Sequence, residues 1–120
     1  MNLNTFKTTL SALIGSTSKK LPTLGRNSHF YVYFDNSGNV ALKNSKGNIC
    51  IITQSDFDIC KKQYCSLRGK KRFQGKYYTD SKLRVPIGRT HAPLIPAVFR
   101  YLCENGYCIC ENCKDGKCLI

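Results

Sequence analysis

The fold is decided by the stretch His29-Phe30-Tyr31-Val32-Tyr33-Phe34, because aromatic and β-branched residues favour the pleated, half-buried surface of a strand. Two further short apolar runs follow it, each set off by a cluster of Asn, Ser and Gly: turns at 36–39 and 44–48, and strands at 40–43 and 49–52. Strands that are joined by such short turns pair with their neighbours. The stretch therefore predicts a three-stranded antiparallel meander.

Apolar residues at helical spacing predict one helix before the meander and one after it. The first helix is expected to stop at Gly15, where a glycine commonly ends a helix. The second should run from about 56 to 67, since Ser55 and Asp58 resemble a capping box. The residues at 15–27 read as a connecting loop.

A third helix is framed by residues typical of helix starts and helix stops. Pro93 and Pro96 fit its first turn, where a proline loses little hydrogen bonding. Asn105 and Gly106 fit its end, with Tyr107 folding back on it as in a Schellman motif. The predicted class is therefore α+β: a small three-stranded antiparallel meander packed with two or three helices, followed by a Cys-rich C-terminal tail.

A chain of 120 residues is of the usual size for one domain. The elements predict three parts within it: an N-terminal amphipathic helix and linker at 1–27, an α+β core with a basic loop at 28–106, and a Cys-rich tail at 107–120. The tail is a possible zinc knuckle.

The positive charge is concentrated in the middle of the chain. The formal net charge is +12, and residues 61–100 hold eleven Lys or Arg against the single acid Asp80. Such a one-sided surface repels itself, and it gains free energy by releasing counterions from a phosphate backbone. The plainer alternative is a solvated face that only aids solubility.

Within this stretch, residues 68–76 combine five basic residues with two glycines and Phe73. Lys and Arg neutralise phosphates, and exposed aromatic rings stack on unpaired bases. The predicted nucleic-acid-binding residues are Lys61, Lys62, Arg68, Lys70, Lys71, Arg72, Phe73, Lys76, Tyr77, Lys82, Arg84 and Arg89.

The aromatic residues allow a second interpretation. Phe73, Tyr77 and Tyr78 would equally serve to pin the loop to the core. Tyr31 and Tyr33 share one face of the first predicted strand, and they form a stacking platform only if the helices cover the opposite face.

The eight cysteines are interpreted together with the N-terminus, which has no apolar run long enough for a secretory signal. An intracellular, cytoplasmic protein is expected, in which cysteines bind metal, carry redox chemistry or are simply buried. The pattern Cys-x-Cys-x2-Cys-x4-Cys predicts a structural Zn²⁺ site with the ligands Cys108, Cys110, Cys113 and Cys118. Cys103 and His91 are substitute ligands for this site. Redox-active thiols and disulfides are the alternatives, and Cys50, Cys60 and Cys65 are expected in the core.

The scarcity of acids narrows the catalytic options. A metal-dependent nuclease would use Asp80 and Lys82, with Asp58 or Asp56 as a second carboxylate ligand. Asp56 and Asp58 also fit the ordinary role of complementing a helix dipole. A metal-independent ribonuclease would instead have to draw on His91 beside Arg89, with Tyr77 or Tyr78.

The sequence as a whole favours a nucleic-acid-binding protein, for DNA or RNA, acting as a regulator or accessory factor. A module that binds an acidic protein partner is a further alternative, and no membrane association is expected. The small size and the Asn and Lys content would suit a phage or mobile-element product.

Overall fold

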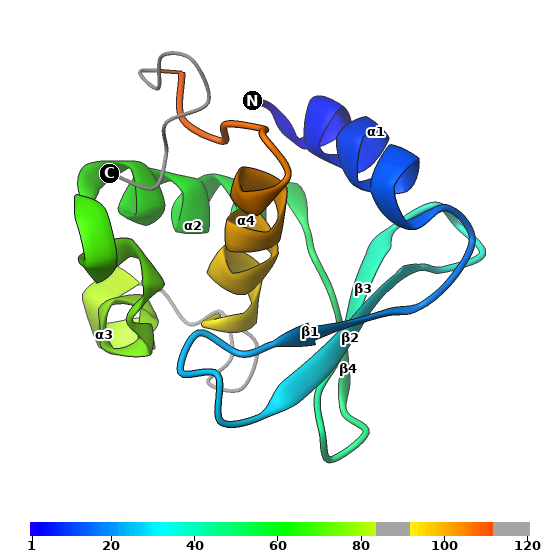
Figure 1. Ribbon diagram of the computed structural model, residues 1–120, viewed down its shortest axis with the longest axis horizontal. Helices are drawn as coiled ribbons and strands as arrows, with labels where there is room; N and C mark the ends of the chain where they lie inside the picture. The colour runs from blue at the N-terminus through cyan, green and yellow to red at the C-terminus, as the bar shows by residue number, and fades with distance from the viewer. Residues whose placement is uncertain (84–91, 112–120) are drawn as a thin grey trace.

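The computed structural model describes residues 1–83 and 92–111 and shows a four-stranded antiparallel sheet with helices against one face (Figure 1). The strands lie in chain order in the sheet: β1 Lys19–Pro22, β2 His29–Phe34, β3 Val40–Lys43 and β4 Ile49–Ile51. The helices are α1 Leu3–Ile14, α2 Gln54–Ser66, α3 Asp80–Leu83 and α4 Leu94–Glu104, and two 3-10 turns lie between α2 and α3: η1 Gly69–Phe73 and η2 Gly75–Tyr78. No helix in this described part is long and apolar enough to cross a membrane. The predicted α+β class is confirmed.

The β2–β3 and β3–β4 hairpins close through the same side-chain device. The first turn residue, Asp35 or Asn44, accepts the backbone N–H groups two and four positions later at 2.9 to 3.0 Å. The fourth turn residue is Gly38 or Gly47, with φ of 79° and 87°, which is the left-handed region that glycine adopts without strain. These local signals set the pairing of the meander, as the sequence predicts.

The prediction of three strands is wrong by one, because the expected connecting loop contains β1. Its sequence, Lys-Lys-Leu-Pro, has little strand propensity apart from Leu21. Leu21 is buried and lies opposite Phe30 of β2, while Pro22 lies opposite His29. Lysine and proline are typical of an edge strand, where one row of backbone groups needs no partner. Pairing with β2 and one buried leucine therefore determine this strand.

The core between the helices and the sheet is built on a cluster of aromatic rings. Phe6 of α1, Phe57 of α2 and Phe99 of α4 have ring centroids 5.1 to 5.8 Å apart, and Tyr64 packs edge-on to Phe99 at 5.2 Å. All four side chains are fully buried. Helices α1, α2 and α4 thus each contribute at least one ring, and replacing such a ring by alanine costs about 3 to 5 kcal/mol. Residues from α1 belong to this same core.

Helix α2 begins at Gln54, and its capping box lies two residues before the predicted one. The N-cap is Thr53, whose hydroxyl accepts the backbone N–H of Asp56, while the Asp56 carboxylate accepts the backbone N–H of Thr53. The same spacing of cap and acid occurs at Ser55 and Asp58, but Ile52 is the last buried residue before the helix. The chain therefore turns into the helix immediately after the sheet.

Helix α4 ends as the sequence predicts. Gly106 has φ of 90° and donates to the carbonyl of Cys103, and Tyr107 donates to the carbonyl of Leu102. These two bonds are the Schellman pattern, which pairs carbonyls that the end of a helix leaves open.

Candidate nucleic-acid interface

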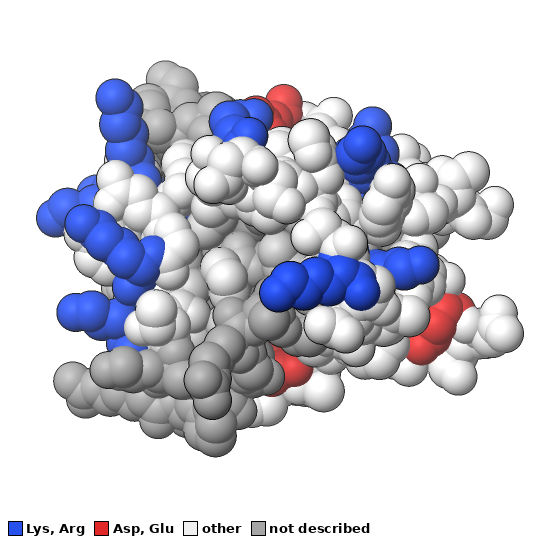
Figure 2. Space-filling model, turned by 90° about the horizontal axis from the view of Figure 1, so that it is seen from below, with Lys and Arg blue, Asp and Glu red and all other residues white. Residues whose placement is uncertain are grey.

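Six exposed basic side chains lie along the segment from α2 to α3, and we call them the basic surface: Lys62, Arg68, Lys70, Lys71, Lys76 and Lys82. Figure 2 shows Lys and Arg side chains gathered at the end of the molecule where Figure 1 places α2 and α3. None of the six forms an ion pair with any residue that the structure describes. Arg84 and Arg89, which were expected to extend this footprint, lie outside the described residues.

The end of α2 fixes the start of this surface. The Arg68 guanidinium donates to the carbonyls of Cys65 and Leu67, at 3.0 and 3.3 Å, and so satisfies groups that the last helical turn leaves open. Gly69 follows with φ of 57° and turns the chain into η1. Because η1 is a short 3-10 turn, Lys70 and Lys71 point to solvent while Arg72 points inward.

Arg72 does not belong to the basic surface, although the sequence predicts it there. Its side chain is only 5% exposed, and its Nε donates to the carbonyl of Leu67 at 2.8 Å. The guanidinium also lies over the Tyr64 ring, 5.0 Å from the centroid. Burial with a backbone acceptor and an aromatic face makes Arg72 a structural residue that holds η1 against α2.

The aromatic residues of the same segment pin it to the core. Tyr78 is fully buried, its hydroxyl donates to the carbonyl of Arg72 at 2.7 Å, and burial raises its pKa. Phe73 packs edge-on to Tyr64, with centroids 6.2 Å apart. Tyr77 is partly buried, with the Lys76 ammonium 5.3 Å from its ring centroid. The second interpretation of these aromatics therefore describes the structure better than exposed stacking does.

Lys61 is used within the molecule. Its ammonium contacts the Glu111 carboxylate and donates to the carbonyl of Met1 at 2.7 Å. The N-terminal amine of Met1 lies 2.8 Å from the same carboxylate. These hydrogen bonds, led by the one from Lys61, lower the pKa of Glu111 to about 2. Lys61 therefore adds less to an anion-binding surface than its exposed neighbours.

Arg100, at the other end of the charged stretch, is also buried. It donates to the carbonyls of Leu24 and Thr23, at 3.1 and 2.9 Å, and its guanidinium lies 5.8 Å from the centroid of Phe73. Burial lowers its pKa from the usual value. Arg100 thus ties the β1–β2 turn to α4.

The predicted zinc site is contradicted. Cys110 forms a disulfide with Cys65 at the end of α2, with the two Cα atoms 5.6 Å apart, and Cys108 is disulfide-bonded as well. A disulfide sulfur has no thiolate to offer a metal. Residues 1–83 and 92–111 hold no group of three or more His, Cys, Asp or Glu that could bind a metal ion. Cys113, Cys118 and the substitute ligand His91 lie outside the described residues.

The disulfide instead joins the segment after α4 to α2. It closes a separation of 45 residues, for which loss of chain entropy in the unfolded state amounts to about 4 kcal/mol of stabilisation. The prediction that Cys65 is a core thiol is wrong, whereas Cys60 is fully buried, and burial raises its pKa to about 12. Cys50 is half-buried.

Of the residues that the nuclease alternative would use, the structure describes the side chains of Asp56, Asp58 and Lys82. Asp56 caps α2, and Asp58 accepts a hydrogen bond from the Gln54 side chain at 2.9 Å. Lys82 is exposed on α3, and the side chain of Asp80 lies outside the described residues. Asp56 therefore lies in the first turn of α2, where its ordinary alternative role is to complement the helix dipole, and it also takes part in the capping box.

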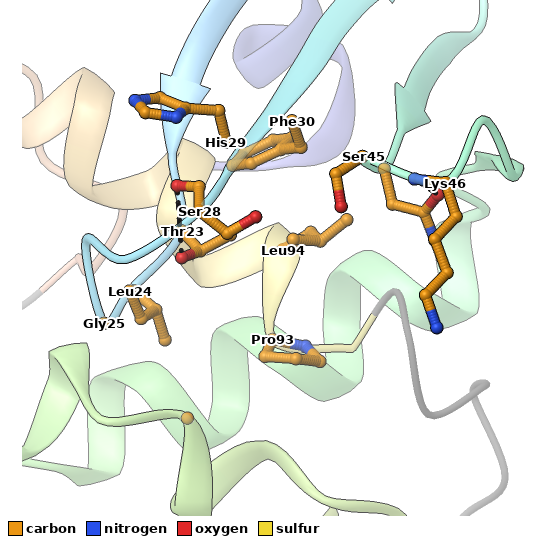
Figure 3. A pocket seen from close by; sticks show the side chains of 12 residues that line it. Thr23, Leu24, Gly25, Ser28, His29, Phe30, Ser45, Lys46, Pro93 and Leu94 are labelled. Carbon is orange, nitrogen blue, oxygen red and sulfur yellow. Dashed lines mark hydrogen bonds between the residues drawn. The ribbon is translucent and has the colours of Figure 1, made fainter.

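A pocket of about 460 Å³ lies where the β1–β2 turn, the β3–β4 turn and the start of α4 meet (Figure 3). Phe30 and Leu94 lie between Thr23 of one turn and Ser45 of the other. Among the described residues its lining contains no acid, and Lys46 is the one Lys or Arg. Sequence reasoning missed it because its walls come from four separate segments, none with a motif of its own.

Comparison of the chain with models of protein families, with curated proteins and with solved structures finds no match.

Proposed function

We propose that the protein binds the phosphate backbone of DNA or RNA through the basic surface, as a regulator or accessory factor. The observation that carries the proposal is the set of six exposed Lys and Arg side chains that have no ion-pair partner in the described part of the chain. Unpaired cations that lie close together gain most when they replace the counterions of a polyanion.

The support beneath the surface suits this role. Arg72, Tyr78 and the disulfide hold η1, η2 and the end of α2 in place without using the exposed lysines. The lysine side chains remain long and mobile point charges, which neutralise phosphates without reading base sequence. Binding that tolerates many sequences is therefore expected.

The test compares two charge reversals that change the net charge equally. Lys70→Glu with Lys71→Glu removes two contacts of the basic surface, whereas Lys7→Glu with Lys46→Glu changes α1 and the β3–β4 turn. At about 0.1 M salt, without magnesium, the first pair should weaken binding about 50-fold, since each phosphate contact contributes roughly eightfold there. Fluorescence anisotropy with a labelled oligonucleotide measures the affinity.

The control pair should change affinity by less than about threefold, because charges beyond the Debye length are largely screened. Equal losses in both pairs would reduce the proposal to a general effect of net charge. Polyglutamate serves as competitor for the alternative of an acidic protein partner. If it displaces the oligonucleotide at equal charge concentration, that alternative is favoured.

The disulfide also bears on the compartment. The cytoplasmic location expected from the sequence implies reduced cysteines, whereas disulfides persist mainly in oxidising surroundings. Rapid alkylation of cells that produce the protein, followed by mass spectrometry of Cys65, reports which state prevails. A reduced Cys65 in cells would agree with the cytoplasm, and an oxidised one would favour an oxidising compartment.

A further inference from the structure

The two faces of the sheet differ sharply in exposure. Phe30 and Val32 of β2 point toward the helices and are fully buried, whereas Tyr31 between them is 39% exposed on the opposite face. Tyr33 lies on the same face as Tyr31, because side chains alternate along a strand. In the described part of the chain the long helices pack on the other face (Figure 1). We call the face with the two tyrosines the open sheet face.

The strand register places a lysine on each side of Tyr31. Lys20 of β1 and Lys43 of β3 both lie directly opposite Tyr31, so the three residues form a row across the sheet on one face. Directly opposed residues in antiparallel strands have Cβ atoms about 4.5 to 5.5 Å apart. The ring is thus flanked by two cations, both of them exposed.

The two tyrosines are not tied down as the buried tyrosines are. Within residues 1–83 and 92–111, neither hydroxyl makes a hydrogen bond and neither ring packs on another aromatic ring. Both rings line a shallow hollow of about 350 Å³ together with Ser18 and Lys43. Tyr31 is exposed and Tyr33 is partly buried, so a ligand in the hollow would meet both residues.

The charge of this face selects the kind of ligand. Lys20 and Lys43 lie on it, and the four strands contain no acidic residue. A ligand that fits must offer flat apolar groups to the rings and negative charge to the lysines beside them. Single-stranded nucleic acid has both at every nucleotide, whereas a duplex hides its base faces in the stack.

We propose that the open sheet face is a platform on which Tyr31 and Tyr33 stack unpaired bases while Lys20 and Lys43 contact the adjoining phosphates. The inference rests on the proposed function in taking nucleic acid as the partner, but it uses a different surface. It also names the form of nucleic acid, which the basic surface alone does not select.

The experiment measures affinity for oligo(dT) and oligo(U) of about twelve nucleotides, and for a duplex of the same length, a size typical of one small binding module. Tyr31→Ala with Tyr33→Ala should weaken single-strand binding about 5- to 150-fold for each stacked base. Duplex affinity should change by less than about twofold, and Tyr31→Phe with Tyr33→Phe should keep both affinities, because stacking needs the ring and not the hydroxyl.

The alanine pair and the Lys70→Glu, Lys71→Glu pair separate the two proposals. Single-strand binding that survives loss of both rings overturns the platform, while the basic surface stands if charge reversal still weakens binding. Single-strand binding that depends on the rings but not on Lys70 and Lys71 supports the platform, and the basic surface then stands only if charge reversal weakens duplex binding. No binding of oligo(dT), oligo(U) or the duplex at low salt removes both.

A second readout uses the unaltered protein, so it does not depend on the variants folding. Ultraviolet cross-linking to oligo(dT), followed by tryptic digestion, should place the cross-link in the peptide of residues 27–43, which carries both tyrosines. Cross-links found only in other peptides would overturn the platform. A preference for oligo(dT) or for oligo(U) identifies which nucleic acid is bound, and a preference for either one supports the platform.

Discussion

The segment from α2 to α3 and the open sheet face use the same residue types in opposite ways. In the first, lysines point to solvent and aromatic side chains such as Tyr78 point into the core. In the second, Tyr31 lies exposed between two lysines, and the residues beneath it fill the core. The comparison teaches that a basic segment rich in aromatics does not by itself present those aromatics to a ligand.

The physical reason lies in the secondary structure that carries each set. A short segment of 3-10 turns has no regular hydrogen-bonded partner, so it needs buried side chains to hold it, and Phe73, Tyr77 and Tyr78 supply them. A sheet is held by its ladder and by one buried face, which leaves the other face free for function.

The largest expected effect sharpens the contrast between two tyrosines. Tyr78→Ala should lower the free energy of unfolding by about 3 to 5 kcal/mol, since it removes a fully buried ring and the hydrogen bond to Arg72. Tyr31→Ala should cost less, about 1 kcal/mol, because Tyr31 is 39% exposed and its hydroxyl makes no hydrogen bond in the described part of the chain. Urea unfolding followed by circular dichroism measures both, and equal losses would break the comparison.

A smaller effect is expected for two adjacent basic residues. Arg72→Ala should lower stability by about 2 to 3 kcal/mol, because it removes a buried guanidinium that donates to the carbonyl of Leu67 and packs on the Tyr64 ring. Lys71→Ala should change stability by no more than about 0.5 kcal/mol and should weaken nucleic-acid binding. If Arg72→Ala leaves the free energy of unfolding unchanged and weakens nucleic-acid binding instead, Arg72 belongs to the basic surface.

The smallest expected effect is the pH dependence of the stability that the ion pair between Lys61 and Glu111 contributes. The lowered pKa of Glu111, about 2 against the usual 4.5, means that its contribution to stability is complete above about pH 5 and is lost as pH falls toward 2. The carboxylate is largely exposed, so the contribution should stay under about 1 kcal/mol. Glu111→Gln should therefore be slightly less stable than the unaltered protein near pH 6 and equal to it near pH 2. A constant difference across that range would contradict the pairing with Lys61.

The parts of the fold that could be predicted from the sequence depend on residues that are neighbours in the chain. The turns after Phe34 and Lys43, the stop at Gly106 and the apolar spacing of three helices are all written in neighbouring residues. β1 was missed because its pairing with β2, rather than its own composition, makes it a strand. Burial of Arg72 and Arg100 was equally out of reach, since their acceptors become known only when the chain is folded.

The cysteines show the same limit most clearly. Spacing groups Cys108, Cys110, Cys113 and Cys118 as a local metal cluster, but Cys110 pairs with Cys65 across 45 residues. Disulfide partners depend on the distance between Cα atoms in the folded chain, which spacing does not report. Of the six lysines predicted for the candidate site, five are exposed and Lys61 is engaged by Glu111, whereas the exposure of the aromatic residues was decided by the fold.

The most direct test of the central claim is the dependence of oligonucleotide affinity on salt. If the six side chains of the basic surface each neutralise one phosphate, a plot of log K against log salt concentration should fall with a slope of about −4 to −5. Lys70→Glu with Lys71→Glu should make that slope shallower by roughly 2. A slope near zero, or no binding at about 50 mM salt, would contradict the claim that this surface binds nucleic acid.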